Sequence, residues 1–162
     1  MGNERIAVFP GTFDPVQYGH ISILGDAARM FDKVFWAVLS NSLKKQPMFD
    51  VSQRLEMMGM IANKFENVEL GSFGGLLVDF ARSKGARFVV RSMRTGMDFE
   101  FELQMSLANK HVAQEIQTVF LPTHQDHFHL NSTTVRDLIL NKKSLNGWTT
   151  LEIEKYIQKT RA

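Results

Sequence analysis

Short apolar runs alternate with longer amphipathic segments along most of this chain, and no other feature constrains its fold as strongly. The runs are rich in β-branched and aromatic residues, as strands are; they cover residues 5–9, 33–40, 67–70, 87–91 and 117–121. Apolar residues recur at helical spacing between them, in residues 21–31, 55–65, 77–81 and 99–112. Four strand-to-helix alternations predict an α/β fold, a doubly wound five-stranded parallel sheet with helices on both faces. Two further helices are expected at residues 132–140 and 150–160.

Length and composition exclude several classes of protein. A chain of 162 residues that is 44% hydrophobic and 22% charged is expected to fold as a single domain over residues 1–162. The absence of cysteine excludes disulfides, thiolate metal sites and cysteine nucleophiles. A net charge of +2 is too small to indicate nucleic-acid binding, and no apolar run approaches the roughly 18 residues of a membrane span. We expect a cytoplasmic protein without nucleic-acid or membrane partners.

The segment Pro10–His20, between the first strand and the first helix, contains two glycines and two prolines. At the carboxyl end of a strand, such a loop offers backbone N–H groups and a helix N-terminus to an anion such as phosphate. Thr12 and His20 add side-chain donors. From spacing alone, a tight turn with an ordinary histidine in the first helical turn is an equal alternative.

This loop resembles the signature of the nucleotidylyltransferase superfamily, in which His-x-Gly-His or Thr-x-Gly-His holds the triphosphate of ATP or CTP. The chain reads Gln17-Tyr18-Gly19-His20, so His20 takes the place of the catalytic second histidine and Gln17 replaces the first position. The resemblance implies a Rossmann-like fold for the predicted sheet.

A second stretch narrows the resemblance. The segment Arg91–Arg94 and residues 98–105 resemble the Arg-Gly-Leu-Arg and Asp-Phe-Glu-Tyr-Glu segments of bacterial phosphopantetheine adenylyltransferases. The similarity runs from about residue 6 to 140 and includes residues 44–49 and 75–81. The family implies transfer of AMP from ATP to 4′-phosphopantetheine, which gives dephospho-CoA and pyrophosphate. On spacing alone, two arginines three residues apart are solvated or paired with an acid such as Glu102.

The resemblance gives each matching residue a role. Catalytic positions are His20, Lys44, Thr12 and Arg91, and the phosphopantetheine site is implied at Thr12, Lys44, Leu77 and Arg91. ATP contacts are implied at Thr12, Phe13, His20, Ser92, Met93, Arg94, Glu102, His127, Phe128, His129, Leu130, Asn131, Ser132 and Thr133. Without the family, the two lysines at 44 and 45 are a solvated turn, and the hydroxyls of Ser132 and Thr133 are a plain helix cap.

Three positions depart from the family pattern. Gln17 and Asn131 replace hydroxyl or imidazole side chains, and Ser92 replaces the glycine between the two arginines. A side chain at Ser92 would crowd a phosphate if the backbone there had a positive φ. These departures leave open a degenerate nucleotide-binding protein without activity. The loop His124–His129 has three imidazoles and a carboxylate, but its spacing does not suit zinc, and no protein metal site is expected.

Adenylyl transfer to a phosphate requires alignment and charge stabilisation rather than a general base. We therefore expect direct in-line displacement, with Mg²⁺ bridging ATP phosphates. The family also implies a homohexamer and feedback inhibition by coenzyme A. The rival enzyme is another adenylyltransferase, such as one acting on nicotinate mononucleotide, because Ser132–Arg136 partly matches its Ser-Thr-x-x-Arg element.

Overall fold

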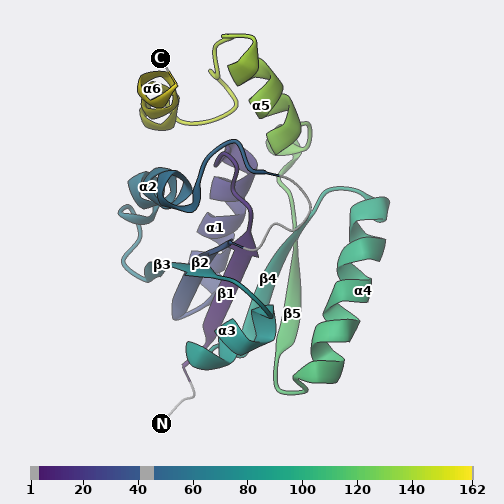
Figure 1. The fold of residues 1–162 in the computed structure, drawn as a ribbon. Coiled ribbons are helices and arrows are strands. Elements are labelled where there is room, and N and C mark those ends of the chain that lie inside the picture. Colours follow the sequence, from purple (N-terminus) through teal and green to yellow (C-terminus); the bar gives the residue numbers. More distant parts are fainter. Residues whose placement is uncertain (1–3, 41–45, 162) are drawn as a thin grey trace.

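The computed structural model describes residues 4–40 and 46–161, and these residues contain a five-stranded parallel sheet flanked by helices (Figure 1). The strands are β1 (Ile6–Gly11), β2 (Lys33–Leu39), β3 (Val68–Phe73), β4 (Phe88–Met93) and β5 (Gln117–Pro122). Their order across the sheet is β3-β2-β1-β4-β5, and every neighbouring pair is parallel. The predicted doubly wound sheet is therefore confirmed.

The helices follow the amphipathic segments. They are α1 (Tyr18–Met30), α2 (Val51–Ala62), α3 (Leu77–Ser83), α4 (Gly96–Val112), α5 (Ser132–Leu140) and α6 (Leu151–Thr160), with a 3-10 turn, η1, at Gln125–His127. Four of the strands run further toward their carboxyl ends than predicted, whereas β2 ends one residue earlier, at Leu39. β3 continues through Gly71 and Ser72 because their backbones stay paired with Ala37 and Val38 of β2, whatever their side chains.

Successive residues of the central strands point to opposite faces of the sheet and build two cores. Trp36 and Val38 of β2 join the larger core, to which α1, α2, α5 and α6 all contribute buried residues. Phe35 and Ala37 of the same strand join the second core, under α3 and the segment that follows α4. Both faces of β2 are thus buried, which explains its uninterrupted apolar sequence.

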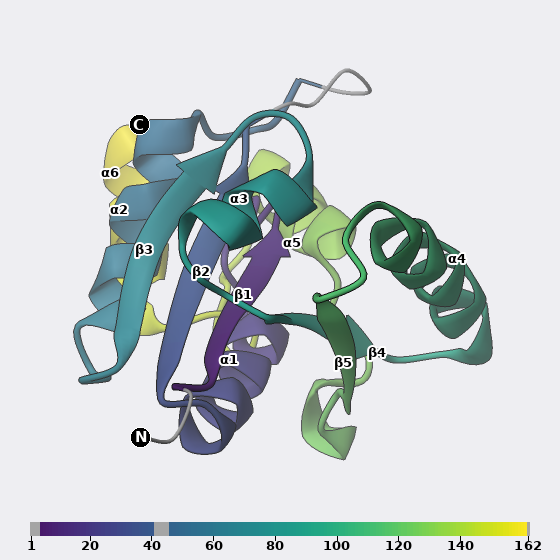
Figure 2. The same cartoon turned by 90° about the horizontal axis from the view of Figure 1, so that it is seen from below.

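The helix α4 is an exception, because none of its residues is fully buried. Figures 1 and 2 both place it at the β4–β5 end of the molecule, away from α1 and α2. Its ring contact with the sheet runs from Phe99 to Phe120 of β5, with centroids 5.7 Å apart.

The C-terminal segment folds back onto the loop between β1 and α1. The Tyr18 N–H donates to the Trp148 carbonyl at 2.9 Å, and the Thr149 hydroxyl donates to the Val16 carbonyl at 2.9 Å. The loop is therefore held by residues 130 and 133 positions away in sequence. Among residues 4–40 and 46–161, no helix combines the length and the apolar character needed to cross a membrane.

Candidate active site

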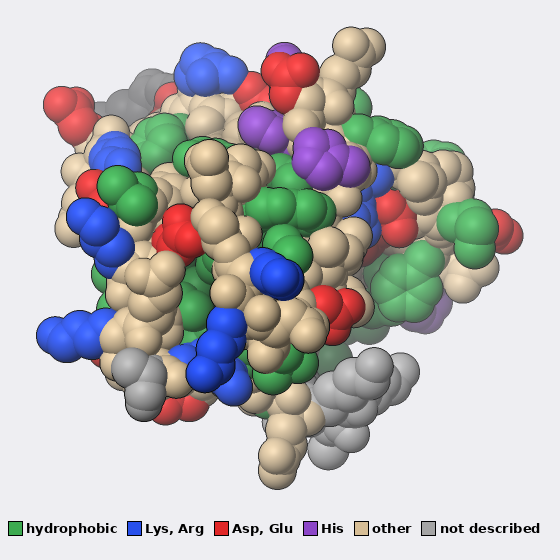
Figure 3. All heavy atoms as spheres, turned by 90° about the horizontal axis from the view of Figure 1, so that it is seen from above, with side chains coloured by type: hydrophobic (Ala, Val, Ile, Leu, Met, Phe, Trp, Pro, Cys, Tyr) green, Lys and Arg blue, Asp and Glu red, His purple; other side chains and the backbone are tan. Residues whose placement is uncertain are grey.

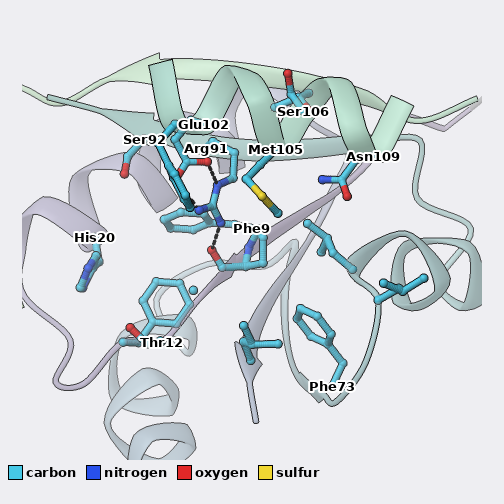
Figure 4. Close-up of a pocket in the computed structure, with 18 of the residues that line it drawn as sticks. Phe9, Thr12, His20, Phe73, Arg91, Ser92, Glu102, Met105, Ser106 and Asn109 are labelled. Atoms are coloured by element: carbon cyan, nitrogen blue, oxygen red, sulfur yellow. Dashed lines mark hydrogen bonds and ion pairs between the residues drawn. The ribbon is translucent and has the colours of Figure 1, made fainter. Parts of the chain in front are cut away.

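The candidate site lies where the strand order reverses. From β1 the chain continues to β2 on one side of it, while β4 pairs with β1 on the other side. The connections that follow β1 and β4 therefore lead away from each other and leave a crevice between the carboxyl ends of these two strands. Open parallel sheets bind ligands at such switch points. A cavity of about 530 Å³ occupies this position (Figure 4), and it is lined by the end of β1, the loop after it, β4, α4 and the start of α3.

The histidine of the first loop is oriented by the start of its own helix. Gln17 is the N-cap of α1, and its side-chain oxygen accepts from the Gly19 N–H. The Gln17 N–H donates to Nδ1 of His20 at 3.2 Å. Since Nδ1 accepts, the neutral ring carries its hydrogen on Nε2, which is free to donate to a ligand. Gln17 and His20 thus form a capping box at the start of α1.

His20 is uncharged near neutral pH. The Phe13 ring meets the imidazole edge-on with centroids 5.0 Å apart. Burial, and next the positive charge of Arg94, lower the pKa of His20 to about 4. The residue keeps partial exposure and lines the cavity. At this position the cavity therefore has a neutral N–H donor rather than a cation.

The loop before His20 is strained and tightly packed. Phe13 has φ 48°, an unfavourable value for a side chain of this size, and its ring is also in contact with Phe9 and Trp36. A Cβ on Gly11 would lie 2.7 Å from the tip of the Phe13 ring, so the close approach requires glycine. Thr12 is exposed and lines the cavity beside them. The packed Phe13 ring thus sets the shape of the loop that carries Thr12.

Arg91 is bound on three sides. Its Nε and Nη2 donate to the two carboxylate oxygens of Glu102 at 2.6 Å each, and its Nη1 donates to the Pro10 carbonyl at 3.2 Å (Figure 4). The strand β4 runs on to Met93, so the expectation that Arg91 ends it was wrong by two residues. Glu102 is thus the acidic partner that the spacing of the two arginines allowed, and it is mostly buried, with a side chain 14% exposed.

Arg94 lies just past β4 and outside the cavity lining. Its Nη1 donates to the Leu130 carbonyl at 2.9 Å, and its Nε lies 3.4 Å from an Asp98 oxygen. The Met93 carbonyl accepts from the Thr123 N–H at 2.8 Å. Arg94 therefore links α4 to the segment before α5, close enough to His20 for its charge to lower that pKa.

The start of α5 differs in detail from the expectation. The hydroxyls of Ser132 and Thr133 were expected to cap the helix, but the cap is Asn131, whose Oδ1 accepts from the Thr134 N–H at 2.8 Å. Asn131 is long enough to reach this N–H from the extended N-cap conformation. The Thr133 hydroxyl instead accepts from Arg136 at 3.1 Å. The preceding residues include a buried Leu130 and an exposed Phe128.

Figure 3 looks down on the carboxyl-end side of the sheet and shows histidine side chains gathered on this face. After β5, the rings of His124 and His127 lie close together, with centroids 6.0 Å apart. The His127 ring is stacked on Tyr18 with centroids 5.9 Å apart, and the His129 ring meets Trp148 edge-on at 5.6 Å. Within the described part of the chain, no three His, Asp or Glu side chains are grouped as metal ligands.

Of the remaining predicted positions, Leu77 and Ser92 line the cavity and Lys44 is not among the described residues. Leu77 begins α3 and lines the cavity with Phe73 and Met105. Ser92 also lines the cavity, and it is not among the described residues with positive φ, so the crowding expected from that conformation does not arise. Lys44 lies outside the described residues.

Two buried charged residues near the site were not predicted. Asp14 is 5% exposed, and its two oxygens accept from the Met48 and Phe49 N–H groups at 2.9 Å. Arg54 is 3% exposed and donates to the Thr12 carbonyl. A signal for Arg54 was present, because it precedes Met58 and Ile61 by four and seven residues, on the apolar face of its helix.

Comparison with known proteins agrees with this geometry. The sequence profile of the cytidylyltransferase-like family matches residues 8–138. A phosphopantetheine adenylyltransferase of Heliobacterium modesticaldum is 46% identical over 133 residues, covering 82% of this chain and 79% of the relative. One from Natranaerobius thermophilus is 40% identical over 157 residues, covering 97% and 96%. Among solved structures, a Plasmodium falciparum nicotinic acid mononucleotide adenylyltransferase superimposes with a TM-score of 0.72 at 12% identity, covering 98% of this chain and 96% of its own.

Proposed function

This chain belongs to the cytidylyltransferase-like family and, within it, to the phosphopantetheine adenylyltransferases, and we propose that it transfers the adenylyl group of ATP to 4′-phosphopantetheine. The products are dephospho-CoA and pyrophosphate, and the reaction is reversible.

The observation that carries this proposal is the composition of the cavity. One end has donors suited to phosphate, on Thr12, His20 and Arg91, while the other is apolar, with Phe73 and Leu77 among its lining. A phosphate joined to a long, flexible arm matches both ends. Nicotinate mononucleotide, the acceptor used by the alternative adenylyltransferase, is compact and has no comparable arm.

The chemistry needs no enzyme nucleophile. A phosphate oxygen of 4′-phosphopantetheine forms the new bond to the α-phosphorus of ATP. The bond to the bridging oxygen breaks, and pyrophosphate leaves with that electron pair. The attacking phosphate is already anionic, so the residues act by alignment and by stabilising charge in the transition state.

His20, Thr12 and Arg91 supply the donors in this proposal. The Nε2–H of neutral His20 donates to oxygens of the transferred group, with the Thr12 hydroxyl beside it. Arg91 binds the phosphate of the acceptor with the N–H groups that Glu102 and Pro10 leave free, and Leu77 contacts the pantetheine arm. Lys44 is proposed as a further cation here, on the resemblance alone.

The ATP side follows the start of α5. We assign the triphosphate to Ser132 and Thr133 in the first turn of that helix, where unpaired N–H groups and the helix dipole favour anions. Arg94 approaches it from the end of β4, and His127 lies near the adenine. The remaining assignments are Phe13, Ser92, Met93, Glu102, Phe128, His129, Leu130 and Asn131.

ATP enters as its magnesium complex. The carboxylate that lines the cavity, Glu102, is fully engaged by Arg91, and the described residues contain no grouped metal ligands. A cage built from protein side chains does not fit this donor set. We therefore assign Mg²⁺ to the phosphate oxygens of ATP, where it neutralises charge.

We also propose that the chain assembles into a homohexamer through a surface that includes α4. Its exposed apolar side chains include Met97, Leu107 and Val112, which are 85%, 62% and 53% exposed. Apolar surface of this extent on one helix is typical of a subunit contact.

Coenzyme A, which resembles the product, is proposed as a feedback inhibitor that competes with the substrates for the cavity between β1 and β4.

The experiment is a pyrophosphate-release assay with purified protein, ATP and Mg²⁺. We expect release with 4′-phosphopantetheine and none with nicotinate mononucleotide. The opposite pattern would select the rival adenylyltransferase. ATP binding without release from either acceptor would identify a nucleotide-binding protein without activity.

A further inference from the structure

The peptide between Thr12 and Phe13 lies at the most constrained point of the candidate site. Both residues line the cavity, and Phe13 holds a positive φ. The peptide is trans, so its carbonyl and its N–H point in opposite directions within one plane. Whatever fixes the Thr12 carbonyl therefore also fixes the direction of the Phe13 N–H.

Arg54 of α2 fixes that carbonyl. Its Nη1 donates to the Thr12 carbonyl at 2.9 Å, and its Nε donates to the Asp50 carbonyl at 3.3 Å. Asp50 is the N-cap of α2, so the planar guanidinium spans the start of its own helix and the loop after β1. Arg54 does not line the cavity, which places it on the core side of the Thr12–Phe13 peptide.

A charge buried to 3% exposure is costly unless it makes specific contacts. Burial lowers the pKa of Arg54, while the negative charges of Asp14 and Asp50 oppose that change. No carboxylate of the described residues lies within ion-pair distance of Arg54. The buried guanidinium is therefore stabilised by its hydrogen bonds to the Thr12 and Asp50 carbonyls.

The Phe13 N–H has no acceptor among the described residues. An unpaired backbone donor beside a cavity is available to a ligand, and phosphate oxygens are strong acceptors. We propose that Arg54 is a positioning residue that orients the Thr12–Phe13 peptide so that the Phe13 N–H and the Thr12 hydroxyl face a bound phosphate. This inference rests on the proposed nucleotidyl-transfer function, and it adds a residue outside the cavity to the site.

The test compares Arg54→Met and Arg54→Lys with Asp50→Ala. Methionine fills the space but holds neither carbonyl, and lysine keeps the charge but cannot span both. Asp50→Ala removes the side-chain cap of α2, which accepts from the Gln53 N–H at 2.8 Å, and leaves the Thr12 contact intact. Asp50→Ala therefore measures the effect of destabilising the N-terminus of α2 while Arg54 still binds the Thr12 carbonyl.

Two readouts separate positioning from stability. The first is kcat and KM for each substrate, beside the thermal midpoint of every variant. We expect Arg54→Met to lower kcat by roughly 10- to 100-fold with smaller changes in KM, and Arg54→Lys to fall between it and the wild type. Asp50→Ala should lose thermal stability and keep a kcat close to that of the wild type.

The second readout is the ¹⁵N–¹H resonance of the Phe13 amide on addition of ATP and Mg²⁺. We expect a large shift in the wild type and in Asp50→Ala, and a much smaller one in both Arg54 variants. A wild-type amide that does not respond, or Arg54→Lys with a wild-type kcat and amide shift, would overturn the proposal. A loss of kcat in Asp50→Ala equal to that in the Arg54 variants would also overturn it. Because ATP alone produces the amide shift, failure of 4′-phosphopantetheine as acceptor would contradict the proposed function without removing this readout.

Discussion

The His20 ring is oriented by its immediate neighbours, while burial and the charge of Arg94 lower its pKa. The Gln17 N–H occupies Nδ1, the Phe13 ring covers one edge, and the pKa falls to about 4. The hydrogen on Nε2 is therefore present throughout the neutral pH range, and the side chain binds a phosphate without competing for a proton. Preorganised donors of this kind act where charge develops in the transition state.

The first prediction concerns this donor. His20→Ala should lower turnover by about 100- to 1000-fold, because the transition state loses a preorganised donor, while ATP affinity falls much less. Initial rates of pyrophosphate release and ATP binding by calorimetry measure the two effects. His111→Ala, at an exposed position near the end of α4, is the matched control. Equal turnover in His20→Ala and the wild type would remove His20 from its assigned role.

A second prediction follows from the lowered pKa. Between pH 6.5 and about 4 the unfolded chain holds a proton at His20 that the folded chain does not. The stability associated with the neutral ring is therefore complete above pH 6.5 and is lost as the pH falls toward 4, by at most about 3 kcal/mol.

Urea unfolding of the wild type and of His20→Gln across this range measures the effect. The wild type should lose stability relative to the variant as the pH decreases, because only the wild type has the buried imidazole. Parallel pH dependences in the two proteins would contradict a lowered pKa at His20.

At the scale of elements, several residues of the candidate site lie in the first turns of helices. The N-terminus of α1 carries His20, that of α3 carries Leu77, and that of α5 carries Ser132 and Thr133. Each follows a parallel strand or a short loop at the carboxyl edge of the sheet, which brings unpaired N–H groups to one end of the molecule. The ion pair of Arg91 and Glu102, both in the cavity lining, then joins β4 to α4.

The caps allow a direct test at this scale. Asn131→Ala removes the cap of α5 and should destabilise the fold by about 1 kcal/mol. It should also weaken ATP binding, because the first turn of α5 frays beside the phosphate. Thr150→Ala is the control, because it removes the cap of α6, which is away from the cavity. The hydroxyl of Thr150 accepts from the Ile153 N–H at 3.4 Å.

Thermal unfolding and ATP titration of both variants decide the outcome. A similar loss of stability in the two, with weaker ATP binding in Asn131→Ala alone, is expected. If ATP affinity fell equally in both, the effect would be general destabilisation rather than a role of the α5 N-terminus.

For the whole molecule, the unusual feature is the exposed side of α4. The helix contributes Phe101 and Met105 to the cavity, yet it retains large apolar side chains in contact with solvent. If these side chains meet another copy of the chain, assembly stabilises one wall of the candidate site. Binding and assembly would then be linked through this helix.

The last prediction concerns this surface. Leu107→Glu places a charge on a side chain that is 62% exposed and outside the cavity lining, so the isolated fold should tolerate it. Sedimentation velocity should show the wild type at six times the chain mass and the variant mainly as smaller species. Gln114→Glu, exposed just beyond α4, is a charge-matched control. A wild-type chain that sediments as a monomer would contradict the assembly.

Much of this protein follows from local sequence. The strands and helices were predictable because burial on both faces leaves short uninterrupted apolar runs in the strands, and amphipathic helices leave a period of 3.6 residues. The positions of Thr12 and His20 followed from a motif whose glycines and prolines act within a few residues, and that of Arg91 from the separate segment Arg91–Arg94. The errors fell where two local patterns compete, as at Asn131, or where backbone pairing extends a strand past its apolar residues, as at Gly71.

Tertiary structure decided what the local patterns cannot contain. The hydrogen bond from Arg54 to Thr12 and the anchoring of Val16 by Thr149 join residues 42 and 133 positions apart. The tertiary structure also decides between the two alternatives for Arg91, because it pairs with Glu102. Burial and the charge of Arg94, contributed by other elements, set the pKa of His20. Sequence alone therefore determined the alternating elements and the residues available for phosphate chemistry. Their orientation and protonation depend on contacts and desolvation that exist only once the sheet has brought distant segments together.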